Sequence, residues 1–378
     1  MDRARPSAAA LNTDSPAPLA AAQPTAVPPA PLSSVLDAPP ERIDPWPGAQ
    51  PFALAGWFDR SGFTPGWTAV LAVVVGWVVF QIVANLGVAA TLLIDLLGRG
   101  LTEPPTAEML LAAVGEHAHA VLVWNSVGQA VGFGAFTWWL ARLTTSAPAP
   151  FLRVGRVDAV GLGLAAVGWA ALYPVVLVAG KLNSLVPLPD VLREADAARA
   201  EMLEGFLLGG DLSPLFLVLT VAFVPAVFEE LLFRGYLMRQ VERKFSPAVT
   251  FAVVGLTFGA YHLTAAQLLP LSILGAYLCF VVWATGSLWS GVLVHALNNG
   301  LAVAVSVALR GRADLDPETV GEVGGPWYVS AALALAGIAA VTAIVRLMLA
   351  HRAARTGGRP DAAPVPFLPL PAPLAVPS

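Results

Sequence analysis

Charged residues are scarce in this sequence. Asp, Glu, Lys and Arg make up only 12% of the 378 residues, whereas hydrophobic residues make up 57%. A soluble domain usually carries about 25% charged residues. The shortage of charge excludes an ordinary soluble globular protein, and the excess of apolar residues predicts an integral membrane protein that crosses the lipid bilayer several times.

Cysteine and clustered basic residues are also nearly absent. Cys279 is the single cysteine, which excludes an intramolecular disulfide and any metal site built from several thiolates. The formal net charge is −4, and no basic stripe with interleaved aromatic residues appears, so no nucleic-acid partner is expected. The expected partners are the lipid bilayer and a peptide or protein associated with it.

The two ends of the chain are rich in Ala and Pro. Residues 1–51 combine Ala and Pro with scattered Ser and Thr, and residues 356–378 have the same Ala/Pro character. Such segments cannot bury enough apolar surface to offset the entropy that ordering removes, so we predict disordered tails. Arg3 and Arg5 are not followed by an uninterrupted apolar stretch, so the first tail is not expected to be a signal peptide.

Between the tails lie about eight apolar runs, each close to the roughly 20 residues that a membrane-spanning helix needs. The runs are Trp67–Leu97, Ala118–Leu143, Ala159–Lys181, Leu215–Leu237, Pro247–Thr264, Leu268–Gly286, Ser287–Leu309 and Trp327–Leu349. The predicted fold class is therefore all-α, a polytopic transmembrane bundle of about eight helices with disordered Ala/Pro-rich tails. Only Gly286 and Ser287 separate the sixth and seventh runs, which leaves open a tight turn or one long broken helix.

Lys and Arg concentrate in the loops on one side of the predicted bundle. With eight spans, that side receives Arg60, Arg142, Arg153, Arg156, Arg239, Arg243, Lys244, Arg346, Arg352, Arg355 and Arg359. Cytoplasmic loops carry such an excess, so this side and both termini are predicted to be cytoplasmic, with Arg310 and Arg312 as exceptions. Two short interfacial helices are expected on the other side, in Thr106–His117 and Ala195–Leu208. High Ala, Gly and Pro usage is typical of a bacterial protein, which favours the bacterial inner membrane.

Three charges lie at the end of the fourth apolar run. Glu230 and Arg234 are four residues apart, so on a helix they share a face and can neutralise each other. Glu229 is turned by about 100° from Glu230 and is left without that partner. Ionisable groups inside a membrane are costly and usually functional. The spacing thus predicts a structural ion pair beside one free carboxylate, although all three charges could instead anchor the helix near the interface.

Two further runs contribute polar side chains at the same four-residue spacing. Phe258 and His262 share a face of the fifth run, and His295 and Asn299 share a face of the seventh. A single buried histidine is more often a satisfied packing residue than a catalytic one. Together with a free carboxylate, however, two imidazoles and an amide can activate a water and stabilise a negatively charged oxygen. This set is sufficient to hydrolyse an amide without a covalent nucleophile.

The three motifs resemble those of the CPBP family of intramembrane proteases, which includes the type II CAAX prenyl endopeptidases and the bacteriocin-processing Abi proteins. The motifs are Glu-Glu-x-x-x-Arg at Glu229, Glu230 and Arg234, Phe-x-x-x-His at Phe258 and His262, and His-x-x-x-Asn at His295 and Asn299. The resemblance covers about Leu212 to Val305. It implies an eight-helix membrane protease core with a water-filled cavity open to the cytosol.

The resemblance also implies roles for single residues. Glu229 and His262 are expected to activate the water, and His295 and Asn299 to stabilise the oxyanion. Glu230, Arg234 and Phe258 are expected to be structural supports. The family is often called metalloprotease, and Glu229, His262 and His295 could form a zinc site with an open fourth position. A His-Glu-x-x-His pair is absent, so a metal-free water activated by glutamate is favoured over zinc.

The motifs predict five segments and leave other functions open. The segments are a disordered tail 1–51, N-terminal transmembrane helices and loops 52–211, a protease core 212–305, a loop and last transmembrane helix 306–355, and a disordered tail 356–378. The predicted function is a membrane-embedded endopeptidase acting on a membrane-associated substrate. The alternatives are a non-catalytic bacteriocin-immunity or membrane partner protein of the same family, and an ion-coupled transporter with Glu229 as its ion site.

Overall fold

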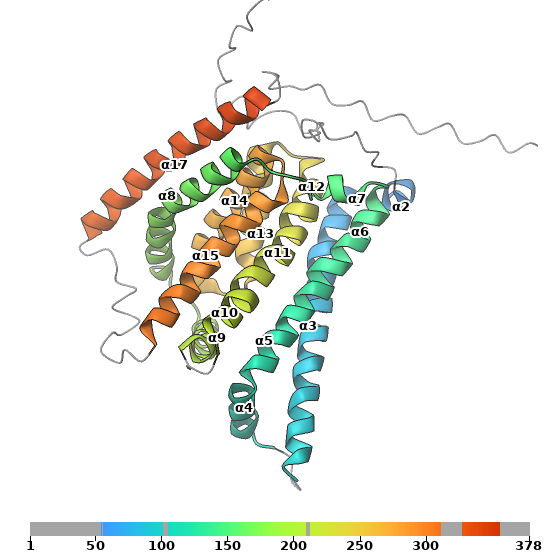
Figure 1. The fold of residues 1–378 in the computed structure, drawn as a ribbon, viewed down its shortest axis with the longest axis vertical. Coiled ribbons are helices and arrows are strands. Elements are labelled where there is room, and N and C mark those ends of the chain that lie inside the picture. The colour runs from blue at the N-terminus through green and yellow to red at the C-terminus, as the bar shows by residue number, and fades with distance from the viewer. Residues whose placement is uncertain (1–53, 55, 101–104, 209–211, 311–326, 356–378) are drawn as a thin grey trace, which may run out of the picture.

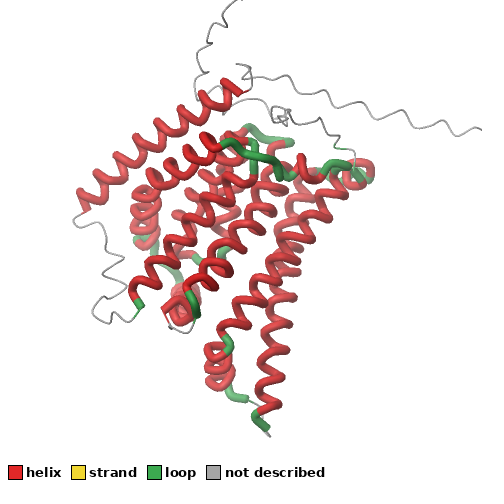
Figure 2. The backbone as a smooth tube through the Cα atoms, viewed as in Figure 1, coloured by secondary structure: helices red, strands yellow, loops and turns green. Residues whose placement is uncertain are grey.

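The computed structural model describes residue 54 and the ranges 56–100, 105–208, 212–310 and 327–355. Within these ranges the chain is helical and contains no strand, which confirms the predicted all-α class (Figure 2). The two predicted disordered tails lie outside the described residues.

Each of the eight predicted runs forms a helix, and short helices connect some of them. The helices before the predicted core are α2 (Trp57–Arg60), α3 (Pro65–Gly98), α4 (Ala107–Glu116), α5 (Ala118–Gln129) with η1 (Ala130–Ala135) and α6 (Phe136–Thr144), α7 (Pro148–Phe151), α8 (Ala159–Ser184) and α9 (Asp190–Leu208). The later ones are α10 (Pro214–Leu217), η2 (Val218–Phe223), α11 (Val224–Glu230), η3 (Leu231–Leu237), α12 (Met238–Glu242), α13 (Pro247–Tyr261), η4 (Ala265–Gln267), α14 (Leu268–Thr285), α15 (Leu288–Leu309) and α17 (Trp327–Arg355).

Six helices of the described residues are long and apolar enough to cross a membrane, and the apolar helix α13 is shorter at 15 residues. The continuous helix from α5 to α6 is not among the six. It carries Asn125 and Gln129, which hydrogen-bond to each other over 2.8 Å and so satisfy part of their polar groups within one helix. The protein is therefore an integral membrane protein built as a helix bundle, and the predicted number of about eight spans is approximate.

The helices pack in pairs across the bundle (Figure 1). α13 lies along α14, α8 lies along α17, and α3 lies along the helix formed by α5 and α6. The continuous segment from α10 to α12 stands between the α3–α5 pair and α15. This central segment carries both predicted glutamates, so the helices around it determine what their side chains meet.

The α13–α14 pair packs closely because small residues line its seam. Gly255 and Gly259 are four apart on α13, and a Cβ at Gly255 would lie 2.7 Å from the backbone of α14. A Cβ at Gly275 of α14 would in turn lie 3.0 Å from Gly255. In a membrane, small residues let two helix backbones approach and gain van der Waals contact. Substituting any of these glycines would move α13, and with it His262 at the end of α13.

A tight turn joins α14 to α15. Gly286 ends α14 in the left-handed conformation, with φ of 72° and ψ of 10°, and its N–H donates to the carbonyl oxygen of Val282. Glycine adopts this conformation without the strain that a Cβ would cause. Ser287 then caps α15. Of the two alternatives left open by the sequence, the tight turn is correct.

The segment from Pro214 to Glu242 is one continuous helix that includes two π-helical stretches, η2 and η3. It continues past Arg234 to Glu242. This length places Glu229 at about the same depth in the bundle as His262. Glu229 lies 13 residues before Glu242, and His262 lies 15 residues after Pro247, so at 1.5 Å per residue both stand about 20 Å from the same end of the bundle. The two π stretches flank the glutamate pair, and π-bulges are frequent at functional sites.

A buried ionic cluster, here called the anchor cluster, lies at that end of the bundle. Its members are Arg153, Arg239 and Glu242. Arg153 donates to both oxygens of Glu242 over 2.9 and 3.1 Å, and Arg239 donates to Glu242 over 3.1 Å and to the carbonyl of Phe151 over 2.9 Å. Arg310 stands at the opposite end, where it donates to two backbone carbonyls over 2.8 Å each. This carbonyl binding explains why Arg310, an exception to the predicted charge distribution, lies at that end.

Candidate functional site

The predicted ion pair forms inside the bundle. Arg234 donates from Nη1 to Oε1 of Glu230 over 2.6 Å, and both side chains are fully buried. A second donor of Arg234 reaches the carbonyl of Gly275 over 3.0 Å. The guanidinium also lies 4.4 Å from the centroid of the Phe258 ring, a cation–π contact. The pair thus ties the central helix to both α13 and α14.

His295 of α15 binds the same carboxylate. Its Nδ1 lies 3.0 Å from Oε1 of Glu230, so this oxygen is shared between the imidazole and Arg234. The contact requires a residue without a side chain at Gly291, because a Cβ there would lie 2.6 Å from Oε2 of Glu230. Since a carboxylate accepts the hydrogen bond, Nδ1 carries the proton and Nε2 points to the other side of the ring.

Glu229 lies on that other side. Its Oε2 is 3.9 Å from Nε2 of His295, and this oxygen is buried without a hydrogen-bond partner. The side chain is 15% exposed, compared with 0% for Glu230. The prediction of one free carboxylate beside a neutralised one is thus matched by the contacts of the two side chains. A buried polar atom without a partner calls for an explanation, and a role in binding or catalysis is one.

His262 ends α13 and is oriented by its own helix. Its Nδ1 lies 2.8 Å from the carbonyl oxygen of Phe258, which leaves Nε2 with the lone pair. The Phe258 ring packs edge-on against both imidazoles, at 4.8 Å from His262 and 5.7 Å from His295. Among the described residues, His262 has no direct hydrogen bond or ion pair to either glutamate. Its neighbour Tyr261 lies within electrostatic range of Glu229.

Asn299 lies one turn beyond His295 on α15. Its Nδ2 donates to the carbonyl oxygen of Val221 over 3.3 Å, in the π-helical stretch η2. Its Oδ1 accepts from Asn298 over 3.4 Å, and Asn298 in turn accepts from Trp169 of α8 over 3.4 Å. The amide of Asn299 is therefore held toward the central helix, on the same face of α15 as His295.

The three potential zinc ligands do not meet at a common point. Donor atoms of Glu229, His262 and His295 do not all come within 4.8 Å of one another, although Oε2 of Glu229 and Nε2 of His295 are 3.9 Å apart. A tetrahedral zinc site needs its ligands about 2.0–2.2 Å from the ion, which puts the donor atoms within about 4 Å of each other. The side chains in this arrangement do not fit a tetrahedral zinc ion.

Another group within the described residues does bring three such donors within 4.8 Å of one another: Asp95, Glu116 and His117. Arg99 forms ion pairs with both Asp95 and Glu116. The neighbouring carboxylates of Glu116 and Asp95 raise the pKa of Arg99, so its charge persists at all ordinary pH values. The group is an ion-pair cluster that joins α3 to the α4–α5 junction.

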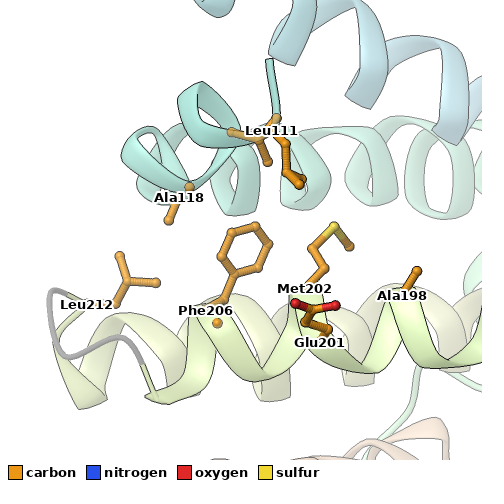
Figure 3. Close-up of a pocket in the computed structure, with 10 residues that line it drawn as sticks. Leu111, Ala118, Ala198, Glu201, Met202, Phe206 and Leu212 are labelled. Carbon is orange, nitrogen blue, oxygen red and sulfur yellow. The ribbon is translucent and has the colours of Figure 1, made fainter. Parts of the chain in front are cut away.

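A pocket of about 360 Å³ lies between α4 and α9, away from Glu229 and Glu230 (Figure 3). Its walls are mainly apolar, and Leu111 faces Phe206 and Met202 across it. Glu201 supplies one carboxylate. Both helices were expected as short interfacial helices; α9 begins at Asp190, five residues earlier than predicted. The pocket is not part of the predicted catalytic set.

Two contacts of the site could not be read from the sequence. The sequence analysis paired Glu230 with Arg234 alone and stacked His295 with Asn299, whereas Glu230 also accepts from His295. The available signal was Gly291, which lies four residues before His295 and therefore on the same face of its helix. The signal for the contact of Asn299 was Pro225, which has no N–H to bind the carbonyl of Val221 four residues before it.

The comparisons with known proteins bear on the central part of the chain. Residues 211–301 match the family model described as Type II CAAX prenyl endopeptidase Rce1-like. No curated protein and no solved structure matches the chain. The matched segment contains all the predicted site residues: Glu229, Glu230, Arg234, Phe258, His262, His295 and Asn299. Residues 211–301 of this membrane protein therefore form an Rce1-like domain, and the resemblance to the CPBP/CAAX protease family is confirmed over that segment.

Proposed function

We propose that the protein is an intramembrane endopeptidase that hydrolyses a peptide bond of a membrane-associated substrate. One observation carries the proposal: Glu229 holds a buried, unpartnered carboxylate oxygen 3.9 Å from His295, inside a domain that matches a protease family. A separation of 3.9 Å is too long for a direct hydrogen bond and is one that a water molecule can bridge.

In the proposed reaction, the Glu229 carboxylate takes a proton from a water as the water oxygen attacks the carbonyl carbon. Nε2 of His262 holds a lone pair and can accept from the same water, which orients it. The carbonyl double bond becomes a C–O⁻ single bond. The C–N bond then breaks as the proton passes from Glu229 to the departing nitrogen, leaving a carboxyl group and an amine.

The negative oxygen requires donors. Nδ1 of His295 already donates to Glu230, so this ring can donate from Nε2 only as an imidazolium. The amide of Asn299 supplies the second donor after exchanging its long bond to Val221. Such donors act strongly where they are buried, and the His295 side chain is only 3% exposed.

Peptide cleavage by the purified protein tests the proposal. The full chain in detergent is incubated with a library of peptides that carry an apolar membrane anchor, and products are identified by mass spectrometry. Glu229→Gln and His295→Ala are expected to abolish cleavage. Glu108→Gln removes an exposed glutamate from the first turn of α4 and is the matched control, expected to cleave normally. Cleavage that survives both site changes would refute the proposal.

The same assay separates the remaining alternatives. A metal-free mechanism predicts full activity after treatment with EDTA, whereas loss of activity that added zinc restores would support a metal enzyme. Specific binding of a peptide without cleavage would favour the non-catalytic partner protein. The proposed setting is the bacterial inner membrane with both termini in the cytoplasm, which protease protection of tagged termini in inverted vesicles can check.

A further inference from the structure

The turn that carries His262 has an unusual backbone conformation. His262 directly follows α13, and Leu263 comes next with φ of 52°, in the left-handed region. A large side chain adopts this conformation only where surrounding contacts hold it. Whatever holds this turn therefore also sets the direction in which the His262 imidazole points.

Arg199 of α9 binds the turn directly. Its Nη1 donates to the carbonyl oxygen of His262 over 3.3 Å, to Oγ1 of Thr264 over 3.2 Å, and to the carbonyl oxygen of Leu263. Oγ1 of Thr264 also donates to the carbonyl of His262 over 3.2 Å. The last carbonyls of a helix lack intrahelical donors, and a cation is favoured at this end of the helix dipole. Arg199 meets both requirements at the end of α13.

Two more side chains hold the rest of the turn. Asp196, also on α9, accepts from the N–H of Ala266 over 2.9 Å. Asn183 of α8 donates to the carbonyl of Ala265 and accepts from the N–H of Leu269, both over 2.9 Å. The backbone between α13 and α14 is thus bound by side chains from two other helices.

α9 is also packed against the rest of the bundle. Met202 and Phe206 point toward α4, where they line the pocket (Figure 3). Phe206 belongs to an apolar cluster with Leu217 of the central helix and Val303 of α15. These contacts hold α9 against the bundle, so α9 can serve as a fixed support for the His262 turn.

We propose that Arg199, assisted by Asp196, is a positioning residue for His262. The inference rests on the proposed function, in which Nε2 of His262 orients the water. Nδ1 of His262 is hydrogen-bonded to the carbonyl oxygen of Phe258, so the direction of the ring depends on the backbone at the end of α13. Without Arg199, the carbonyl oxygens of His262 and Leu263 lose the donor that comes from α9, the left-handed residue relaxes, and the imidazole loses its fixed direction.

Kinetics and histidine NMR of the full chain in detergent test this proposal together. Arg199→Ala is expected to lower kcat about tenfold to a hundredfold with little change in KM, because a misplaced group slows the chemical step. Arg199→Lys keeps a cationic donor and should restore part of the rate. The chain has five histidines, and in ¹⁵N-labelled protein only the His262 signals should shift in Arg199→Ala. Arg193→Ala is the matched control, because Arg193 is on the same helix and, within the part of the chain that the structure describes, forms its ion pair with Asp190.

Each outcome decides the proposal. Unchanged kcat and unchanged His262 signals in Arg199→Ala would overturn it, as would equal effects of Arg193→Ala. If Arg199→Ala does not fold, Asp196→Asn removes only the assisting acceptor charge and should give a smaller change of the same kind; no change in Asp196→Asn would then overturn the proposal. If the wild type cleaves no peptide, the proposed function fails, while the NMR comparison still decides whether Arg199 positions His262.

Discussion

The central helix from Pro214 to Glu242 carries two buried groups of charges that differ in how well they are satisfied. In the anchor cluster, both oxygens of Glu242 accept hydrogen bonds from arginines. In the second group, Oε2 of Glu229 and Oε2 of Glu230 are buried without a partner. Both groups stand on the same rigid element about 18 Å apart, at 1.5 Å per residue between Glu230 and Glu242.

This difference in hydrogen bonding assigns a structural role to the anchor cluster and a chemical role to Glu229. A buried carboxylate with every oxygen paired can hold helices together, and further change in its charge state would only weaken it. A buried carboxylate with a free oxygen keeps the capacity to accept a proton or bind a new group. The comparison therefore predicts that changes in the two groups have opposite consequences, one for activity and the other for stability.

The largest expected effect is on activity, in Glu229→Gln. The amide keeps the size of the side chain but cannot take a proton, so kcat should fall about 10²–10⁴-fold, the usual contribution of a general base. Thermal unfolding in detergent should occur at nearly the wild-type temperature, since no ion pair is lost. A large drop in the unfolding temperature would place Glu229 among the structural charges and end the comparison.

The second effect is on stability, in Glu242→Gln. The change removes the buried carboxylate charge to which Arg153 and Arg239 both donate, and breaking such a pair costs about 3–5 kcal/mol. We expect a much lower unfolding temperature and an unchanged kcat per folded molecule, with the folded fraction measured by gel filtration. Normal stability with lost activity would reverse the assignment of the two groups.

A smaller effect is expected in Gly291→Ala. The added Cβ would lie 2.6 Å from Oε2 of Glu230 and must push that carboxylate away from His295. Overpacking of this kind costs about 1–3 kcal/mol. Activity should fall together with stability, because this contact belongs to the site and to the core at once. Gly300→Ala, on the same helix with open space around it, is the control and should change neither.

The smallest effect is expected in Arg99→Ala, at the exposed ion-pair cluster of Asp95, Glu116 and His117. Exposed pairs contribute little, and salt screens them over about 10 Å at 0.1 M. The pKa of Arg99 is raised by its carboxylate neighbours, so the pair weakens with added salt and does not lose the arginine charge as pH rises through the physiological range. A change in unfolding temperature as large as that of Glu242→Gln would contradict this.

Much of the fold followed from local patterns. Apolar runs of spanning length predicted the helices, and four-residue spacing predicted that Glu230 would pair with Arg234 and leave Glu229 free. These features depend only on residues within a turn of each other. The central helix also continues past Arg234 to Glu242, which brings Glu229 to about the level of His262.

The remaining parts depend on how one helix is placed against another, which helical periodicity does not encode. The bond from His295 to Glu230 requires α15 to approach through Gly291, and the bond from Arg199 to the His262 turn joins segments 63 residues apart. The π-helical stretch η2 is followed by Pro225, which lacks the N–H that would bind the Val221 carbonyl, whereas η3 contains no proline. The contacts between helices are set by tertiary packing and became visible only in three dimensions.

Under the proposed function, the depth of the site limits the length of what the protein can cut. Glu229 stands about 20 Å from the end of the central helix that carries the anchor cluster, at 1.5 Å per residue. An extended peptide advances about 3.3 Å per residue, so a chain end threaded in from that side needs about six residues before its scissile bond arrives. Shorter ends would not reach the Glu229 carboxylate, so the protein would select its substrates by the length of their tails.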